Sequence, residues 1–298
     1  MAATRRLSEL LATVRPRVAL PEPPFTVSLS GGADSATLSL LAVEASRDVV
    51  ALHVDHGLKG SAIMREAAVA IARRLDMEIE VVAVTVAEGP SPEEQARDAR
   101  YAVFDVHERP LLTAHTRDDN AETILINLIR GTGAAGLAGI PTRRPPNTTR
   151  PLLDVTRDET REIAVMADLP FRDDPMNEDP ALTRNRVRHH ILPLMREINP
   201  RVVEAISRAG ITLRADHLYL EGLVGDFEPS SGVPVGLLDT LPRPLGDRLL
   251  GRMLGVAAVG ITADRIERMR AAMSSDSGRE ELAAGRSVIR RGALLFVE

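Results

Sequence analysis

The sequence predicts an α/β protein whose parallel sheet carries helices on both faces. Short apolar runs rich in β-forming residues alternate with helical segments over residues 25–128, which is the pattern of a parallel sheet with crossover helices. Polar side chains follow directly after three of the predicted strands. The chain is 298 residues long, enough for about two domains. We expect a smaller, mainly helical C-terminal domain after the sheet.

The first predicted strand leads into a glycine turn that is typical of a phosphate site. Residues 25–27 are apolar, Ser30–Gly32 form the turn, and a helix runs from Asp34 to about Ser46. Glycines let the backbone approach a ligand, and the amides of the turn and first helical turn converge on one spot. Ser30 and Ser35 add hydroxyl donors, and Asp34 suits a metal between phosphate oxygens. The alternative is a capped strand-turn-helix without a ligand.

Three further strand–helix pairs follow along the chain. The predicted strands are Val49–Val54, Ile79–Val84 and Leu111–Ala114, and the predicted helices are Ser61–Leu75, Glu93–Val106 and Asp118–Leu128. Ligands of parallel sheets bind beyond the carboxyl ends of the strands. We therefore expect one shared pocket lined by Ser30–Ser35, His53–His56 and His115–Asp119.

The residues at the end of the second strand are candidate nucleotide contacts. His53, Asp55 and His56 are also potential metal ligands, but they lack the helical spacing or firm clustering of a metal site. We expect the backbone of this turn to hold an adenine ring instead.

Two adjacent carboxylates, Asp118 and Asp119, begin the helix that follows the fourth strand. The helix dipole favours acids there, so simple helix capping is one interpretation. Mg²⁺ on ATP prefers one or two carboxylates plus phosphate oxygens, and one of this pair could supply them together with Asp34. Glu122, one turn along, either orients the pair or faces water. The same helix ends at Arg130 in a glycine-rich loop that runs to Gly139 and could serve as a cover.

Several motifs resemble those of known enzymes. The loop S-G-G-A-D-S at Ser30–Ser35 is similar to that of the ATP pyrophosphatase (PP-loop) family. Further runs resemble, in order and spacing, those of the tRNA(Ile)-lysidine synthetases in that family. These runs are E-Q-A-R-D-A-R-Y at 94–101, R-G-T-G-A-A-G-L-A-G-I at 130–140, R-P-L-L at 150–153, D-P-M-N-E-D at 174–179 and T-R-N-R-V-R-H at 183–189. The resemblance covers about residues 25–200.

The resemblance implies a Rossmann-like PP-loop fold and a specific reaction. Such enzymes use ATP, with Mg²⁺, to join L-lysine to carbon 2 of the wobble cytidine in the CAU anticodon of tRNA(Ile). The cytidine is first adenylated, and the products are lysidine, AMP and pyrophosphate. The expected ATP-binding residues are Ser30, Gly31, Gly32, Ala33, Asp34, Ser35, His53, Asp55, His115, Arg130 and Gly131. The expected catalytic residues are Asp34, Asp118, Asp119, Arg184 and Arg188, with the metal on Asp34 and Asp119.

Positive charge is concentrated toward the C-terminal third. The chain has a net charge of −5, whereas residues 184–201 contain five arginines and one acid, and residues 241–298 contain ten arginines and seven acids. This separation is the electrostatic pattern expected for binding a nucleic-acid backbone, although solvated arginine-rich helices look similar. We assign tRNA contacts to Arg186, Arg188, Arg196 and Arg201.

The composition of the chain argues against other functions that this fold could have. The chain has no cysteine, which argues against a tRNA thiolation enzyme that carries sulfur on cysteines or a cluster. The charge separation argues against an adenylating ligase for a small molecule, and the acid pair argues against a nucleotide sensor without catalysis. We expect no secretory signal or membrane span, and therefore a cytoplasmic protein. A homodimer is kept as a candidate assembly.

We predict three parts of the chain. Residues 1–200 form the catalytic domain, 201–228 a helical connection, and 229–298 a small tRNA-contacting domain. Within the last two parts we expect helices at 201–223, 245–256 and 262–273, and short strands at 287–289 and 294–297 that form a terminal hairpin.

Overall fold

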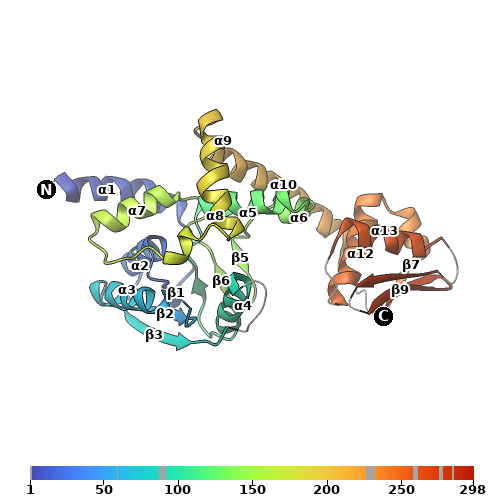
Figure 1. The fold of residues 1–298 in the computed structure, drawn as a ribbon, viewed down its shortest axis with the longest axis horizontal. Helices are drawn as coiled ribbons and strands as arrows, with labels where there is room; N and C mark the ends of the chain where they lie inside the picture. Colours follow the sequence, from blue (N-terminus) through green and yellow to red (C-terminus); the bar gives the residue numbers. More distant parts are fainter. Residues whose placement is uncertain are drawn as a thin grey trace. The chain divides into compact units, whose positions relative to one another are not determined.

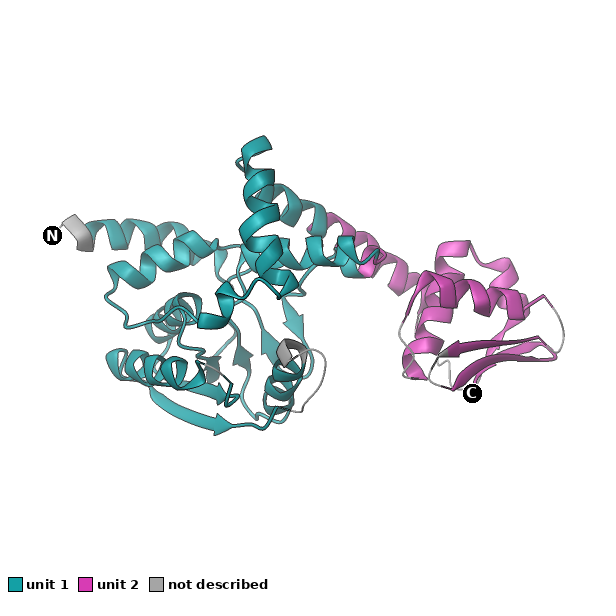
Figure 2. Cartoon of the chain, viewed as in Figure 1, with its two compact units in different colours: residues 1–131, 136–210 teal, residues 132–135, 211–298 magenta. Residues whose placement is uncertain are grey.

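The computed structural model describes residues 2–58, 60–86, 92–225, 232–257, 261–274, 278–283 and 285–298. These residues form two compact units, shown in different colours in Figure 2. The first comprises residues 1–131 and 136–210, and the second comprises residues 132–135 and 211–298. The predicted boundary at 228 lies outside the described residues, and the three-part division stays a prediction.

The first unit is built on a six-stranded, mostly parallel sheet (Figure 1). Its strands are β1 Phe25–Ser28, β2 Val49–Asp55, β3 Glu78–Ala83, β4 Leu111–Leu112, β5 Arg143–Arg144 and β6 Thr148–Thr149. Their order is β3-β2-β1-β4-β6-β5, and β5 pairs antiparallel to β6 at the edge. The predicted α/β class with a parallel sheet is confirmed. The strands β5 and β6 were not predicted, because their short polar sequences, R-R and T-T, show no strand pattern.

Helices connect and cover these strands. They are α1 Ala2–Val14, α2 Ala33–Ala45, α3 Ser61–Arg74, α4 Pro92–Asp105, α5 Arg117–Ile129, α6 Ala134–Leu137, α7 Arg157–Met166, α8 Thr183–Arg186, α9 Leu192–Ile198 and α10 Val202–Val224, with short turns η1 Arg15–Arg17, η2 Pro175–Glu178 and the π-helical η3 Val187–Ile191. No helix among the described residues is both long and apolar enough to cross a membrane.

The central strands β1, β2 and β4 bury side chains on both faces of the sheet, which explains why they are rich in apolar residues. Successive residues of a strand point to opposite faces. Along β2, Val49 and Ala51 therefore join the core beneath α2, α3 and α7, while Leu52 and Val54 join a second core with Tyr101 of α4. A third cluster packs α5 against η3, α9 and the start of α10. Helix α2 is thus packed into the first core and helix α5 into the third.

The glycine-rich loop after α5 packs tightly against that helix. Gly139 has a φ of +69°, and a Cβ there would lie 2.2 Å from the amide oxygen of Asn120. That oxygen accepts a hydrogen bond from the backbone of Ile140 at 2.7 Å, and Asn127 donates to the carbonyl of Gly136 at 2.8 Å. Glycine is therefore required at 139 by the close approach of the loop to α5.

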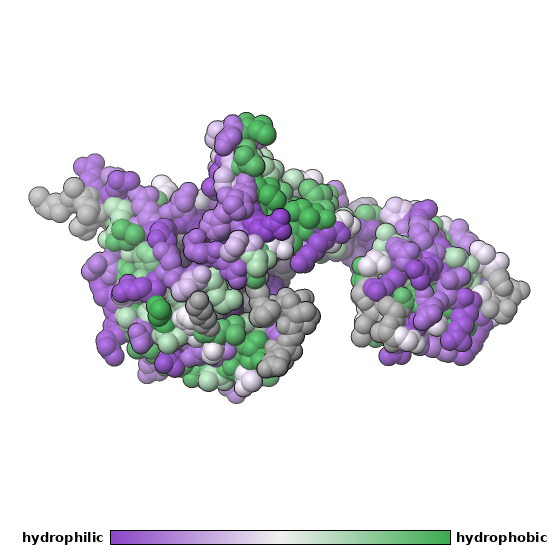
Figure 3. Space-filling model, in the orientation of Figure 1, coloured by the Kyte–Doolittle hydropathy of each residue, from purple (hydrophilic) through white to green (hydrophobic). Residues whose placement is uncertain are grey.

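The described residues of the second unit include the end of α10, further helices and a four-stranded antiparallel sheet. The elements are α11 Val235–Thr240, α12 Arg243–Val256 and α13 Ala263–Ala272, with strands β7 Val233–Pro234, β8 Arg279–Ala283, β9 Arg286–Arg291 and β10 Leu294–Val297 in the order β7-β10-β9-β8. The expected helices are α12 and α13, and the expected hairpin is β9–β10. On the face drawn in Figure 3, hydrophilic residues dominate this unit. The charged sequence of β8 hides the alternation that would have identified it as a strand.

Candidate active site

A cavity of about 690 Å³ opens at the carboxyl ends of β1, β2 and β4. Its wall includes most of the residues that the sequence assigned to nucleotide binding and catalysis. Those lining it are Ser30, Gly32, Ala33, Asp34, Ser35, His53, His115, Asp119, Arg184 and Arg188. The structure therefore has a pocket at the strand ends, and it joins the glycine turn to Asp119 of the acid pair.

The glycine turn is held in shape by its own serines and by α3. The hydroxyl of Ser35 accepts a hydrogen bond from the amide of Ser30 at 3.2 Å and donates to the carbonyl of Gly32 at 3.0 Å. Gly31 has a φ of +95°, and a Cβ there would lie 2.3 Å from the carbonyl oxygen of Met64. Gly32 caps α2 without a side-chain hydrogen bond, so the first amides of the helix are open to an anion.

Asp119 combines helix capping with a place in the cavity wall. One of its oxygens, Oδ2, accepts hydrogen bonds from the amide and hydroxyl of Thr116, both at 2.8 Å, which completes a capping box. The other oxygen, Oδ1, accepts from Nη2 of Arg157 at 2.7 Å. The capping interpretation and the functional interpretation of this residue are therefore compatible.

Arg157, the first residue of α7, lies at the centre of the acidic cluster, and the sequence did not identify it. Besides Asp119, its guanidinium binds Oε1 of Glu122 at 2.9 Å, and its Nε lies 4.0 Å from Oδ2 of Asp34. Thr156 and Glu159 form a capping box that could have predicted the start of α7. No sequence pattern indicates that the side chain at the next position turns toward Asp34.

Glu122 is a buried counter-charge for the arginines of the site. Its side chain has no exposed surface. Both oxygens accept from Arg188, at 2.8 and 3.0 Å, Arg157 adds a third bond, and Nε of Arg184 lies 3.9 Å away. The structure thus excludes the water-facing alternative for Glu122. It also explains the spacing of Arg184 and Arg188, which lie four residues apart on one side of α8 and η3, whereas Arg186 is exposed.

The two cavity-lining aspartates have pKa values shifted in opposite directions. Burial and the negative charge of Asp119 raise the pKa of Asp34 to about 6, although the hydroxyl of Thr160 and the guanidinium of Arg157 oppose the shift. Burial also disfavours ionised Asp119, but Arg157 and the Thr116 amide hold its pKa below the usual range. A divalent cation between the two would relieve their repulsion.

We predict that Asp34→Asn stabilises the metal-free protein at neutral pH. The folded-state pKa of Asp34 lies above its unfolded value, so ionisation costs stability as the pH rises through about 4 to 6, and the full cost remains above pH 6. The variant should gain about 1–3 kcal/mol at pH 7.5 and nothing near pH 4. Urea unfolding in EDTA at both pH values tests this. A loss of stability at pH 7.5 would show that burial and repulsion do not dominate at Asp34.

The histidines that follow β2 and β4, His53, His56 and His115, are neutral at physiological pH. Burial, with added repulsion from Arg150 and other arginines, lowers the pKa of His115 to about 3. Burial and Arg100 lower the pKa of His56 to about 4, and burial lowers that of His53. Nδ1 of His53 lies 2.8 Å from the carbonyl oxygen of Leu29, which fixes the ring at the end of β2. These imidazoles suit hydrogen bonding to a neutral base rather than charge neutralisation.

Eight residues assigned from the sequence do not line this cavity. They are Gly31, Asp55, Asp118, Arg130, Gly131, Arg186, Arg196 and Arg201, and Arg186 is at an exposed position. Asp55 pairs with Arg65 at 3.1 Å, and Arg201 pairs with Glu204 at 2.6 Å. Asp118 accepts from Arg196 and from the backbone amide of Arg157, both at 2.9 Å. Asp118 therefore anchors α7 from outside the cavity wall.

We predict that Asp118→Ala mainly lowers folding stability, whereas Asp119→Ala mainly lowers nucleotide binding. Asp118 is 5% exposed and holds the Arg157 amide, so its loss should cost about 1–3 kcal/mol of stability and change ATP affinity only a few-fold. Loss of Asp119 should remove metal-dependent nucleotide binding. Urea unfolding and ATP titrations with and without Mg²⁺ on both variants distinguish them. Equal loss of nucleotide binding would contradict the different placement of the two side chains.

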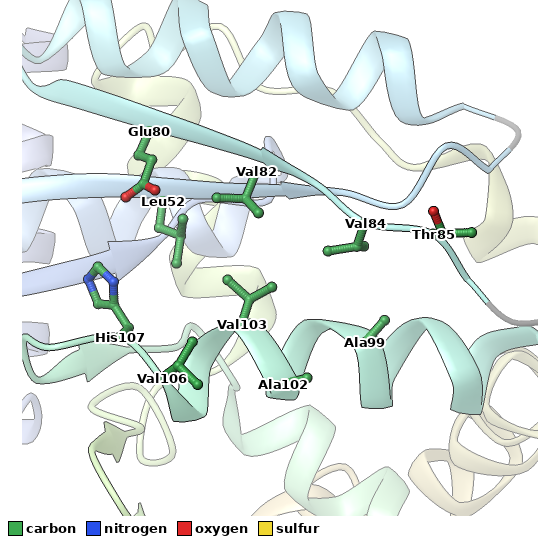
Figure 4. Close-up of a pocket in the computed structure, with 10 residues that line it drawn as sticks. All are labelled: Leu52, Glu80, Val82, Val84, Thr85, Ala99, Ala102, Val103, Val106 and His107. Carbon is green, nitrogen blue, oxygen red and sulfur yellow. The ribbon is translucent and has the colours of Figure 1, made fainter.

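A separate, apolar groove of about 640 Å³ lies between β3 and α4 (Figure 4). Val82, Val84 and Val103 face it, and Glu80 and His107 lie at one end. None of the residues assigned to catalysis or nucleotide binding lines this groove. Its wall is mostly aliphatic, whereas the glycine turn, the aspartates and the arginines line the cavity at the strand ends, which we therefore take as the candidate site.

Comparison with known proteins agrees with this geometry. The family model of the PP-loop domain matches residues 2–195. A tRNA(Ile)-lysidine synthase of Salinispora tropica is 36% identical over 93% of this chain and 92% of its own length, and one of Thermobifida fusca is 38% identical over 80% of each. Among solved structures, the U34-tRNA thiolase NcsA of Methanococcus maripaludis, with its [4Fe-4S] cluster, has a TM-score of 0.58 at 21% identity. That match covers 70% of this chain and 79% of the thiolase, and it supports the fold alone.

Proposed function

The chain belongs to the PP-loop domain family and, within it, to the tRNA(Ile)-lysidine synthases, and on this premise we propose how its cavity performs the reaction. It is a ligase that forms a C–N bond and uses ATP to make lysidine on tRNA(Ile). The observation that carries the proposal is one cavity that joins the open amides of α2 to Asp34, Asp119 and the arginines of α8 and η3.

The reaction has two steps. Oxygen 2 of the wobble cytidine attacks the α-phosphate of ATP, the bond to the β-phosphate breaks, and pyrophosphate leaves. The neutral side-chain amine of lysine then attacks carbon 2, AMP leaves with the oxygen, and the amine releases its extra proton. Both steps require positioning and the neutralisation of negative charge more than covalent help from the protein.

The residues of the cavity divide these tasks. The amides of the Ser30–Ser35 turn and α2 hold phosphate oxygens, and Arg184 and Arg188 stabilise charge near the transferred AMP. Carboxylate oxygens are what Mg²⁺ prefers, and Asp34 and Asp119 already hold a cation, the guanidinium of Arg157, so this donor set fits the ion. When bound, Mg²⁺ supplies charge neutralisation on the phosphates. We assign acceptance of the lysine proton to one of the acid pair, and we choose Asp119 because it lines the cavity and Asp118 does not.

We assign the tRNA contacts to arginines around the cavity and in the second unit. Arg186 is exposed, and Arg188 lines the cavity beside it. The chain has only two tyrosines and no tryptophan, so phosphate contacts rather than aromatic stacking dominate. The unpaired bases of an anticodon loop are accessible to such a pocket. A cytoplasmic location and a homodimer stay predictions from the sequence.

Transfer of labelled lysine to RNA tests the proposed function. The purified protein is incubated with ATP, labelled lysine and a tRNA(Ile) transcript with a CAU anticodon, and a transcript with uridine at the wobble position serves as control. We expect label in the first transcript only, with one AMP per lysine. ATP turnover without RNA would favour a small-molecule ligase, and ATP that binds but is never consumed would favour a sensor.

A further inference from the structure

The guanidinium of Arg157 occupies the space between the two aspartates proposed to bind the metal. Its Nη2 donates to Oδ1 of Asp119 at 2.7 Å, and its Nε lies 4.0 Å from Oδ2 of Asp34. The side chain is 26% exposed and lines the cavity together with the glycine turn. A fixed cation and an incoming divalent cation would therefore compete for the same carboxylate oxygens.

Arg157 is not needed to neutralise the third acid of the cluster. Glu122 already receives two hydrogen bonds from Arg188, at 2.8 and 3.0 Å, and these would remain if Arg157 moved. Arg157 could therefore leave the cluster without breaking the buried pair of Glu122 and Arg188. In this structure Arg157 contacts both Asp34 and Asp119, and Nη2 of Arg188 lies 3.6 Å from the same Oδ1 of Asp119.

The start of α7 is anchored beside the phosphate-binding turn. The backbone of Arg157 is therefore fixed, and only its side chain can change position. The hydroxyl of Thr160 donates to Oδ1 of Asp34, and the backbone amide of Arg157 donates to Asp118 at 2.9 Å. These bonds hold the first turn of α7 against α2 and α5. A guanidinium that left the aspartates would remain next to any triphosphate bound at the N-terminus of α2, and guanidinium binds phosphate oxygens bidentately.

We propose that Arg157 is an exchangeable counter-ion. In the free protein it holds Asp34 and Asp119 together, and when the divalent cation and ATP bind, it gives up these carboxylates and binds phosphate oxygens of ATP. This inference rests on the proposed function. By linkage, Arg157 weakens binding of the metal alone and strengthens binding of the nucleotide with its metal. It thus discourages a metal ion from occupying the site before ATP arrives.

Metal and nucleotide titrations of Arg157→Ala and Arg157→Gln test the proposal. Mn²⁺ is the probe, followed by electron paramagnetic resonance without nucleotide, and the α,β-methylene analogue of ATP is then titrated in the presence of Mn²⁺. We expect both variants to bind Mn²⁺ about tenfold more tightly, and the analogue at least about tenfold more weakly, than the unaltered protein. Arg6→Ala is the matched control, because Arg6 of α1 pairs at 2.6 Å with Glu162 of α7, the helix that carries Arg157, and neither residue lines the cavity.

Each titration tests a different part of the proposal. Unchanged or weaker Mn²⁺ binding by both variants would contradict the competition, and unchanged affinity for the analogue would contradict the transfer to phosphate. If Arg157→Ala does not fold, Arg157→Gln and Arg157→Lys carry the test; the lysine variant should keep Mn²⁺ binding weak yet lose analogue affinity, since it retains charge but not the bidentate fork. If the unaltered protein binds no analogue, the proposed function itself fails, and the Mn²⁺ comparison still reports on the competition.

Discussion

Replacing Asp34 by alanine should abolish pyrophosphate release in the presence of tRNA and ATP, with a fall in rate of about 10³-fold or more. Asp34 is the first acidic residue of α2, it lies against the phosphate-binding turn, and it is one of the two aspartates that share the guanidinium of Arg157. Without Asp34, the proposed metal ion loses one of its ligands, and the negative charge that develops on the leaving pyrophosphate is less well neutralised. Pyrophosphate released over time is the quantity to measure.

Asp48→Ala is the matched control for this experiment. Asp48 immediately precedes β2, at the end of the strands opposite the cavity, where it pairs with Arg109 at 2.8 Å and its side chain is 59% exposed. The control should release pyrophosphate at the unaltered rate. Near-normal turnover by Asp34→Ala would contradict the role that we propose for the glycine turn and its aspartate in the reaction.

Replacing Glu122 by alanine should cost about 3–5 kcal/mol of folding stability, because it removes one partner of a buried ion pair. Glu122 has no exposed side-chain surface and receives three hydrogen bonds from Arg157 and Arg188. The arginines left behind would be desolvated without their carboxylate. Urea unfolding at pH 7.5 measures the loss.

An exposed pair provides the comparison for Glu122. Glu44 of α2 pairs with Arg15 at 2.8 Å near the surface, and Glu44→Ala should cost no more than about 1 kcal/mol. The double variant Glu122→Leu with Arg188→Leu should recover part of the loss, because neither charge is then left alone. A cost for Glu122→Ala as small as that for Glu44→Ala would mean that the arginines of the site do not depend on this carboxylate.

The fold of the first unit was predictable because its strands are buried on both faces. Runs such as Val49–Val54 are apolar except for His53, and their alternation with amphipathic helices specifies a parallel sheet. The second unit was harder to predict. Its strand β8, with the sequence R-E-E-L-A, is recognisable only through its pairing with β9, which is a long-range contact that local sequence does not encode.

The site was predictable where a motif and a strand end coincide. Asp34 and Asp119 were identified in this way, and both line the cavity. The sequence could not separate Asp118 from Asp119, because adjacent helix residues diverge by about 100° and only the packed structure decides which one faces the cavity. Arg157 was missed for a similar reason, since its role depends on α7 packing against α2 and α5, more than a hundred residues away from Asp34 in the chain.

A structure of the protein with Mg²⁺ and the α,β-methylene analogue of ATP tests the central claim most directly. The account predicts the triphosphate at the N-terminus of α2, with the ion about 2.1 Å from carboxylate oxygens of Asp34 and Asp119. A nucleotide bound in another cavity, or an ion coordinated without either aspartate, would contradict it.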